Sequence, residues 1–255
     1  MRIPRIYDSK MQTQLGSELQ LDESGANHVS KVLRLKTGDL IRVFDGRGHE
    51  FEATLVQVGK KTVVTLSREL TNNSESPLWV ELLQVISRGD RMDFTLQKAV
   101  ELGVSKIIPL TSERCGVKLD GERAAKKIES YQKLVISACE QCGRAVVPQV
   151  APLQSLDSLL QELQTGSDNT PTTTPDGREF INITLDPRAT HKLTSLPPTK
   201  AYRLLIGPEG GFSADEVQQT LAAGFTGVTL GPRILRTETT ALVTLSILGS
   251  HFGDL

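Results

Sequence analysis

The feature that most constrains the fold is an alternation of two kinds of apolar segment after residue 77. Short apolar runs typical of buried strands occur at 78–86, 106–110, 181–185, 203–206 and 228–230. Segments in which apolar residues recur at helical spacing occur at 92–102, 122–142, 153–163, 213–223 and 237–248. Strands that alternate with helices form mostly parallel sheets covered on both faces, so this part of the chain is predicted to be an α/β domain.

The first 70 residues have the pattern of a small β domain. Short apolar runs over 40–44, 52–56 and 62–66 are separated by turn residues such as Asp45 and Gly46, a pair typical of β-hairpins. These runs predict a small barrel, with a short helix over 28–35 at its rim.

Two polar stretches interrupt these patterns. Residues 71–77 are polar and end in a proline, which is typical of a linker, so we expect one domain over 1–73 and a second over 74–255. The stretch 164–178 is polar and proline-rich, and it predicts a flexible surface insertion within the second domain.

Composition excludes several classes of protein. No apolar run approaches the roughly 20 residues that a membrane-spanning helix needs, and the N-terminus has no apolar signal-peptide region. The three cysteines are an odd number, which disfavours a disulfide scaffold and favours a reducing compartment. Cys139 and Cys142 have no second Cys/His pair nearby, so no metal site is expected. These observations predict a cytoplasmic protein that uses neither a membrane nor a metal.

The charges are unevenly distributed along the chain. In total, 29 Lys and Arg stand against 30 Asp and Glu, a net charge of −1. Residues 1–150 hold 22 basic and 19 acidic side chains, whereas residues 151–255 hold 7 and 11. The first part is therefore the expected contact for a polyanion such as RNA, although charges scattered over a solvated surface would give the same count.

The strongest functional signal is a turn directly after the apolar strand that ends at Ile206. The turn contains Gly207, Pro208, Glu209, Gly210 and Gly211. The next helix has Ser213 at its cap and Glu216 at the capping-box position. Glycines permit positive φ and close approach of backbone to a ligand, and ligands of open α/β sheets bind at the carboxyl ends of strands. The turn therefore indicates a ligand site, with a tight connection that binds nothing as the alternative; its spacing matches neither a P-loop nor a dinucleotide-binding fingerprint.

A second turn of this kind follows the strand that ends at Leu230. It runs Gly231-Pro232-Arg233-Ile234-Leu235-Arg236 and leads to a helix capped at Thr237 or Glu238. Because both turns follow strands of one predicted sheet, we expect them to form two walls of one pocket. The helix itself has few charged groups, so we expect it to be buried or packed on a partner subunit.

The segments Gly-Pro-Glu-Gly-Gly-Phe-Ser at 207–213 and Leu-Gly-Pro-Arg-Ile-Leu-Arg-Thr-Glu-Thr at 230–239 resemble the knotted SPOUT class of S-adenosylmethionine-dependent RNA methyltransferases. Within that class the chain is most similar to the family that methylates uracil N3 in 16S ribosomal RNA. Further segments with this resemblance lie at 2–5, 28–35, 98–104, 112–114, 140–144 and 147–148. Only 151–180 is unmatched and is expected to be variable, and Thr240 stands where the family usually has alanine.

The resemblance implies an architecture, a cofactor and partners. It implies an α/β C-terminal SPOUT domain with a trefoil knot, an exception to the rule that chains do not thread loops, and an N-terminal PUA-like RNA-binding β-barrel. It also implies a homodimer with each active site built from both subunits, acting on 16S rRNA of the small ribosomal subunit. S-adenosyl-L-methionine is expected to bind in the knot loops, largely through backbone groups. The expected cofactor-binding residues are Leu185, Ile206, Gly207, Pro208, Glu209, Gly210, Gly211, Leu230, Gly231, Ile234, Leu235 and Thr237.

The expected catalytic residues are Arg236 and Glu238. Uracil N3 is a poor nucleophile until its proton is removed, so a cation that stabilises charge on O2 and O4 would help. Arg236 is assigned this role, and Glu238 is expected to orient it or to meet the amino group of the cofactor. An ion pair between the two residues, serving only the start of the helix, is the alternative.

The expected RNA-binding residues are mostly arginines and lysines, because Arg binds phosphate with two parallel hydrogen bonds. They are Arg2, Arg5, Lys31, Arg34, Lys98, Glu101, Arg114 and Arg144. Lys98 and Glu101 are three residues apart on a predicted helix, so a surface ion pair explains them equally well. Two other functions remain open: a non-catalytic RNA-binding or ribosome-assembly protein of the same fold, and a methyltransferase for another RNA nucleotide.

Overall fold

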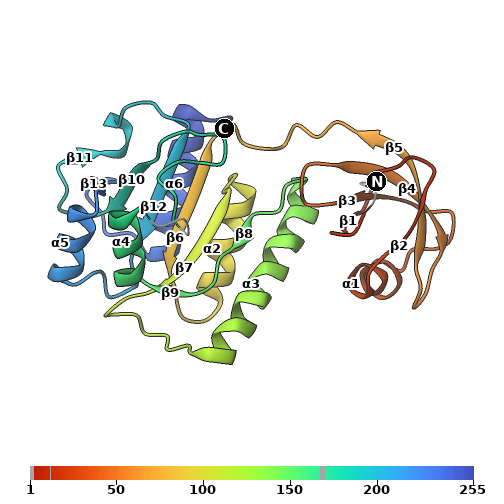
Figure 1. The fold of residues 1–255 in the computed structure, drawn as a ribbon, viewed down its shortest axis with the longest axis horizontal. Coiled ribbons are helices and arrows are strands. Elements are labelled where there is room, and N and C mark those ends of the chain that lie inside the picture. Colours follow the sequence, from red (N-terminus) through yellow and green to blue (C-terminus); the bar gives the residue numbers. More distant parts are fainter. Residues whose placement is uncertain (1–2, 12, 167–169) are drawn as a thin grey trace. The chain divides into compact units, whose positions relative to one another are not determined.

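The computed structural model describes residues 3–11, 13–166 and 170–255. The chain divides into two compact units, which are considered one at a time (Figure 1). Unit 1 consists of Met1–Glu75 and Ile136–Val147, and unit 2 consists of Ser76–Val135 and Pro148–Leu255. Unit 1 therefore includes a stretch that the sequence analysis placed in the second domain.

Unit 1 contains a five-stranded sheet in the order β1-β3-β4-β5-β2. Its strands are β1 (Arg5–Tyr7), β2 (Glu18–Gln20), β3 (Leu40–Phe44), β4 (Glu50–Gln57) and β5 (Val63–Leu70). β1 pairs in parallel with β3, and the other pairs are antiparallel. β3 has its predicted bounds and β4 and β5 overlap theirs. β1 and β2 have three residues each, too few for an alternating pattern to be recognised.

The helical segment of unit 1 begins earlier than predicted. α1 (Glu23–Asn27) follows Asp22, whose side chain accepts a hydrogen bond from the backbone N–H of Gly25 at 2.7 Å and so caps the helix. A π-helical turn over His28–Val32 continues it. The helix predicted over 28–35 thus corresponds to this turn alone, and Arg34 beyond it has a positive φ of 55°.

Arg5 joins the two stretches of unit 1. Its Nε donates to Glu50 Oε1 at 2.8 Å, and its Nη2 donates to the carbonyl of Arg144 at 3.0 Å. Its Nη1 donates to the carbonyl of Cys139, and its guanidinium lies 4.4 Å from the centre of the Phe44 ring. Arg5 and Arg144 are only 6% and 5% exposed. This corrects the prediction that these two arginines bind RNA, because both are buried against protein acceptors.

The predicted linker is also held in place. The Glu75 carboxylate accepts hydrogen bonds from Arg144 Nη2 at 2.8 Å and from the backbone N–H groups of Ala145 and Val146, each at 3.0 Å. Asn72 Nδ2 donates to the carbonyl of Gly143 at 2.9 Å. The polar residues after β5 therefore attach to the second stretch of unit 1.

Unit 2 contains an eight-stranded sheet in the order β11-β13-β10-β12-β6-β7-β8, with β9 also paired to β7. Its strands are β6 (Trp79–Val85), β7 (Lys106–Thr111), β8 (Gln149–Val150), β9 (Gln154–Ser155), β10 (Ile181–Leu185), β11 (His191–Lys192), β12 (Ala201–Ile206) and β13 (Thr226–Thr229). Every pairing in this sheet is parallel among the described residues. The predicted α/β fold is confirmed.

Helices cover both faces of this sheet (Figure 1). They are α2 (Asp90–Glu101), α3 (Gly121–Cys142), whose last residues belong to unit 1, α4 (Leu156–Thr165), α5 (Ala214–Ala222) and α6 (Thr237–Phe252). On β6, Leu83 and Val85 pack into the core formed with α4, while Gln84 between them faces the start of α6. α4 begins after its predicted first residue because Ser155 caps it, with its Oγ accepting from Ser158 N–H.

Most of the predicted flexible insertion is held against the sheet; residues 167–169 lie outside the described residues. The guanidinium of Arg203, a residue 1% exposed on β12, donates to the carbonyl of Pro171. Arg178 Nη1 donates to the carbonyl of Lys200 at 3.1 Å. The described residues after 169 lie mostly at the surface, as predicted, and these two arginines attach them to β12 and to the residue before it; their flexibility stays a prediction.

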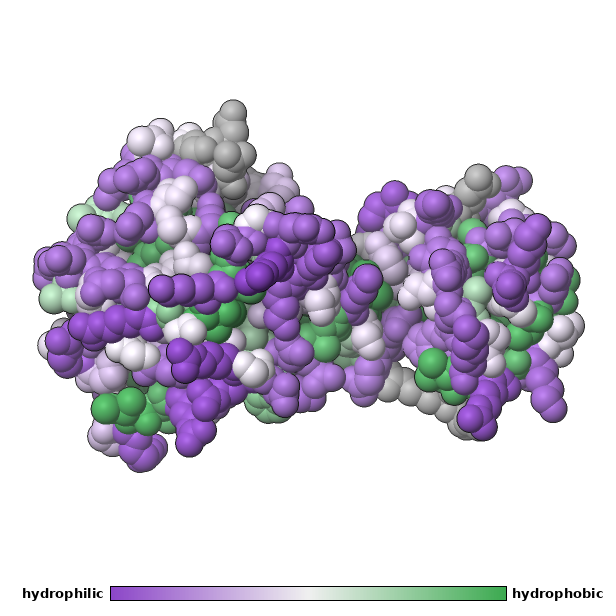
Figure 2. All heavy atoms as spheres, turned by 90° about the horizontal axis from the view of Figure 1, so that it is seen from below, coloured by the Kyte–Doolittle hydropathy of each residue, from purple (hydrophilic) through white to green (hydrophobic). Residues whose placement is uncertain are grey.

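Hydrophilic side chains cover most of the face that Figure 2 shows of each unit, interrupted by small hydrophobic patches. Among the described residues, no helix combines the length and the apolar character that crossing a membrane requires.

The Arg5–Glu50 pair generates the first prediction. Glu50→Gln leaves the Arg5 guanidinium buried without a counter-charge, so we expect the free energy of unfolding to fall by about 3 kcal/mol. Calorimetric unfolding of the full chain measures this change. Glu52→Gln is the matched control, because its partner Arg68 is exposed and such pairs contribute at most about 1 kcal/mol. Equal effects of the two variants would contradict a stabilising role for the buried pair.

The same measurement has an expected pH dependence. Burial alone would raise the pKa of Glu50, but the hydrogen bonds from Arg5 and Asn72 outweigh burial and hold that pKa below its usual value. The stabilisation is therefore fully present above the ordinary glutamate pKa and is lost as the pH falls through the lowered folded-state pKa. The difference between wild type and Glu50→Gln should shrink on acidification.

Candidate functional site

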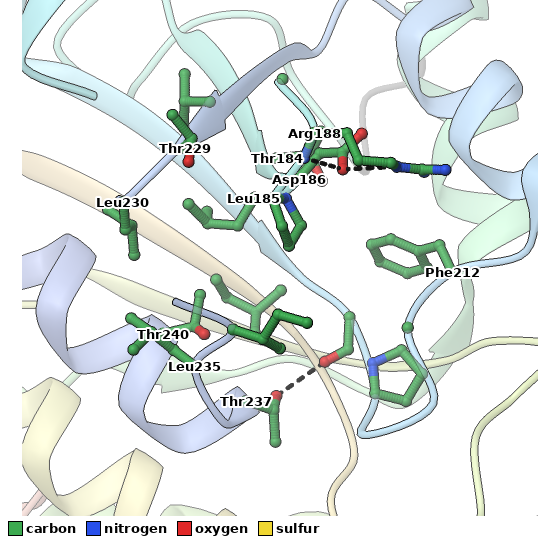
Figure 3. A pocket seen from close by; sticks show the side chains of 18 of the residues that line it. Thr184, Leu185, Asp186, Arg188, Phe212, Thr229, Leu230, Leu235, Thr237 and Thr240 are labelled. Atoms are coloured by element: carbon green, nitrogen blue, oxygen red, sulfur yellow. Dashed lines mark hydrogen bonds and ion pairs between the residues drawn. The ribbon is translucent and has the colours of Figure 1, made fainter. Parts of the chain in front are cut away.

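Three neighbouring strands of unit 2 end at one cavity. β10 lies between β12 and β13, and the three run parallel, so their carboxyl ends share an edge of the sheet. Residues 184–188, 206–212, 227–231 and 233–237 line a cavity of about 700 Å³ at this edge (Figure 3). The two predicted turns thus form two of its walls, and the end of β10, where Leu185 was a predicted cofactor residue, adds a third.

The first turn, after β12, is compact because glycines occupy the positions at which its backbone lies against neighbouring side chains. A Cβ added at Gly207 would lie 3.2 Å from the ring of Phe212, and one at Gly210 would lie 3.3 Å from Arg114 Cβ. Gly211 has a positive φ of 65°. The turn therefore borders the cavity with residues that carry little or no side chain.

Glu216 anchors this turn. Its Oε2 accepts from Ser213 N–H at 2.8 Å, while Ser213 Oγ accepts from Glu216 N–H at 3.3 Å, which is the predicted capping box. Its Oε1 accepts from Glu113 N–H at 2.7 Å. One buried carboxylate therefore holds the start of α5, the glycine-rich turn and the loop after β7 together.

A hydrogen bond joins the start of α6, just after the second turn, to the first turn. Thr237 Oγ1, at the first residue of α6, donates to the carbonyl of Gly207 at 2.8 Å (Figure 3). Within the second turn, Gly231 has a φ of 122°, which favours glycine. Ile234 lines the cavity although it is 86% exposed.

All twelve predicted cofactor residues line this cavity. They are Leu185, Ile206, Gly207, Pro208, Glu209, Gly210, Gly211, Leu230, Gly231, Ile234, Leu235 and Thr237. Thr240, at which the chain departs from the resembled family, also lines it, and its hydroxyl donates to the carbonyl of Arg236 at 2.9 Å. The contact of these residues with a ligand stays a prediction.

The two predicted catalytic residues have different environments. Arg236 is exposed, lines the cavity and has no ion-pair partner in the part of the chain that the structure describes. Glu238 does not line the cavity, and its Oε2 is buried with no hydrogen-bond partner among the described residues. Within those residues the two side chains therefore do not form the helix-start ion pair that was the alternative.

Charged residues at the cavity were missed by the sequence analysis. Arg91, in the first turn of α2, lines it and pairs with Glu209 at 2.9 Å. Asp186 and Arg188 line it after β10 and pair at 3.2 Å. For Asp186 and Arg188 a signal was present, because charged residues directly after an apolar strand mark a binding edge.

Of the RNA-binding residues predicted in the first domain, Lys31 and Arg34 are exposed in unit 1. Arg2 lies outside the described residues. Arg5 is buried, as shown above. Lys31 and Arg34 are thus the described members of this predicted group that RNA can reach.

In unit 2, the predicted RNA-binding residues are accessible but already form ion pairs or hydrogen bonds within the protein. Lys98 Nζ pairs with Glu101 Oε1 at 2.7 Å on α2, as the surface ion-pair interpretation expects. Arg114 is exposed, and its Nη1 donates to the carbonyl of Gly210 at 3.3 Å. Arg114 therefore borders the glycine-rich turn.

Within the described ranges, no group of three or more His, Cys, Asp and Glu side chains is arranged to hold a metal ion. Cys139 is buried, and burial raises the pKa of its thiol to about 12. A thiol in that state is protonated at neutral pH and is a poor metal ligand.

A family model described as "RNA methyltransferase domain" matches residues 74–249, and one described as "RNA methyltransferase PUA domain" matches residues 21–66. The Ribosomal RNA small subunit methyltransferase E of Buchnera aphidicola subsp. Schizaphis graminum is 36% identical over 100% of this chain and 98% of its own length. The protein of the same name from Bacillus subtilis is 32% identical over 94% of this chain and 93% of its own.

Solved structures give the same result. The Ribosomal RNA small subunit methyltransferase E from Neisseria gonorrhoeae, bound to S-adenosyl methionine, is 41% identical, covers 99% of both chains and has a TM-score of 0.89. A putative methyltransferase from Legionella pneumophila, in complex with the cofactor SAM, is 38% identical, covers 100% of both chains and has a TM-score of 0.90.

Glu216 generates a prediction about the site. Glu216→Ala leaves the N–H groups of Ser213 and Glu113 without their acceptor, so we expect the free energy of unfolding to fall by about 2 kcal/mol. Gln218→Ala, an exposed substitution on the same helix, should change it by less than about 0.5 kcal/mol. Chemical denaturation of both variants tests the difference; a Glu216→Ala protein as stable as the control would refute the anchoring role.

Proposed function

The chain belongs to the RNA methyltransferase family, and on this premise we propose that it transfers a methyl group from S-adenosyl-L-methionine to N3 of a uridine in 16S rRNA of the small ribosomal subunit. The observation that carries the proposal is the convergence of both glycine-containing turns and the end of β10 on one cavity. A protein that only bound RNA would not need such a cavity beside an exposed arginine.

The residues present fit the cofactor. The cavity of about 700 Å³ lies within the range of roughly 300–1,000 Å³ typical of small-molecule sites. Apolar side chains such as Leu185, Leu230 and Leu235 line it and suit an adenine ring (Figure 3). The glycine-containing walls allow backbone groups to approach a ligand closely. Leu185 and the two turns are therefore the proposed binding residues.

When bound, the cofactor supplies an electrophilic methyl group. The acceptor is uracil N3, whose proton must be removed before or during transfer. We place the Arg236 guanidinium against O2 or O4 of the uracil, where it stabilises the negative charge that N3 deprotonation creates. Its exposure at the cavity and its lack of an ion-pair partner among the described residues support this role.

Glu238 is proposed to orient Arg236. Both residues lie at the start of α6, and the buried Oε2 of Glu238 has no hydrogen-bond partner among the described residues. Burying an acceptor without a hydrogen-bond partner costs free energy unless a donor reaches it. Arg236 is the nearest cation along the chain. The amino group of the cofactor is the other possible donor.

A homodimer is part of the proposal. Ile234 is 86% exposed, lies two residues before Arg236 and lines the cavity. An apolar side chain presented at the edge of a site is suited to burial against a second copy of the chain. The proposed location is the cytoplasm, where ribosomal RNA is available, and the exposed Lys31 and Arg34 of unit 1 are proposed RNA contacts.

Arg236→Ala tests the catalytic role. We expect turnover to fall about 10²–10³-fold, because one charge-stabilising donor is lost from the transition state, while the cofactor Kd changes less than twofold. Methylation of small subunits by labelled cofactor gives turnover, and calorimetry gives the Kd. Arg123→Ala, which removes an exposed arginine of α3, is the control. Full activity of Arg236→Ala would overturn the assignment.

The acceptor is tested by mass mapping of nucleosides in rRNA after incubation of small subunits with enzyme and labelled cofactor. The proposal predicts label on N3 of a uridine. Label on another base or on a 2′-hydroxyl would identify a methyltransferase of different specificity, and absence of label with intact RNA binding would favour a non-catalytic protein.

Charge reversal tests the RNA-binding surface. Lys31→Glu combined with Arg34→Glu should weaken RNA binding and lower the slope of log affinity against log salt by about 2, because two phosphate contacts are lost. Lys60→Glu combined with Lys61→Glu carries the same charge change elsewhere in unit 1. If both pairs weaken binding equally, the effect is one of general charge and not of this surface.

A further inference from the structure

Gln84 lies outside the cavity but contacts one of its walls. It is fully buried near the end of β6, where its register partner on β12 is Ile206. Its Nε2 donates to Thr237 Oγ1 at 3.1 Å and to the carbonyl of Val85 at 3.0 Å. The same Thr237 hydroxyl donates to the carbonyl of Gly207. Gln84, Thr237 and Gly207 thus form a chain of hydrogen bonds that reaches the cavity.

The orientation of the Gln84 amide follows from its neighbour. The carbonyl of Val85 can only accept a hydrogen bond, so the amide group that faces it must be the NH₂ and not the oxygen. The opposite orientation would set two acceptors 3.0 Å apart. The NH₂ group is therefore directed to both Val85 and Thr237.

The direction of the Thr237 hydroxyl follows in turn. A hydroxyl has one proton to donate, and the Gln84 NH₂ cannot accept it. Thr237 Oγ1 must accept from Gln84 and give its proton to the Gly207 carbonyl. Gln84 therefore selects the one hydroxyl orientation that joins the start of α6 to the glycine-rich turn.

Stability does not account for this residue. Gln84 Oε1 is buried and has no hydrogen-bond partner among the described residues. Burying an unpaired acceptor costs free energy, so an unbranched apolar side chain would remove that cost, although it would leave the Val85 carbonyl without this donor. These two effects oppose each other, so stability gives little reason for a glutamine here. An apolar side chain, however, could not orient Thr237.

We propose that Gln84 is a positioning residue for the methyl donor: by orienting the Thr237 hydroxyl it fixes the Gly207 carbonyl and the spacing of the two cavity walls. The inference rests on the proposed function, because it assumes that S-adenosyl-L-methionine occupies this cavity. Gln84 does not line the cavity, so it acts through Thr237 and Gly207.

The test is cofactor binding to full-length variants, measured by calorimetry. Gln84→Met removes the donor at nearly constant volume, so we expect a Kd about tenfold weaker. The free energy of unfolding should change little, because the lost hydrogen bond to Val85 and the removal of the unpaired Oε1 act in opposite directions. Gln218→Met, an exposed glutamine on α5, should bind as the wild type does. Once Thr237→Val has removed the hydroxyl, adding Gln84→Met should have no further effect on the Kd.

Gln84→Glu is the second variant, and when ionised it replaces the donor that faces Thr237 with an acceptor. An ionised carboxylate accepts a hydrogen bond from the Thr237 hydroxyl, which then no longer donates to the Gly207 carbonyl. Cofactor binding should therefore be weak at high pH. It should recover at low pH, when the protonated carboxyl can donate again. A purely structural role would not produce this recovery relative to wild type.

The results of these experiments distinguish a failure of the proposed function from a failure of the positioning role of Gln84. A wild-type protein that does not bind the cofactor refutes the proposed function. If the wild type binds and Gln84→Met binds equally tightly, or if Gln84→Met and Thr237→Val have additive effects on the Kd, the positioning role is overturned.

Discussion

The parallel direction of β6, β12, β10 and β13 is the constraint on which the candidate site depends. Because neighbouring strands point the same way, the segments that follow them emerge at one edge, even though their positions in the sequence differ by up to about 150 residues. The Thr237–Gly207 hydrogen bond then joins the two turns, and Glu216 holds the first turn to the loop after β7.

The walls of the site could be predicted from the sequence because their signals are local. Gly207, Gly211 and Gly231 occupy turns directly after recognisable strands, and Ser213 with Glu216 marks the start of a helix within four residues. All twelve residues expected at the cofactor line the cavity for this reason. The identity of the ligand came from resemblance and not from these patterns.

What could not be predicted depends on contacts distant in sequence. Arg5 and Arg144 resemble any other basic residue until the fold buries them, and the acceptors of Arg5 at Cys139 and Arg144 are more than 130 residues away. Gln84 sits within an apolar strand, where a polar residue has no periodicity to mark it. The polar stretches before unit 2 and after α4 have the composition of flexible segments, but the buried Arg144 and Arg203 form hydrogen bonds with them. The composition of a segment shows how polar it is, but it does not show whether the fold supplies hydrogen-bond partners for it.

The discontinuity of unit 1 has a consequence for synthesis on the ribosome. Residues Met1–Glu75 leave the exit tunnel well before Ile136–Val147, which provide two acceptors of Arg5 and the donors to Glu75. During this interval the nascent sheet holds charged groups whose partners do not yet exist, so unit 1 cannot complete its interior until α3 has been made. The order of translation therefore makes the folding of the first unit wait for a helix that begins in the second.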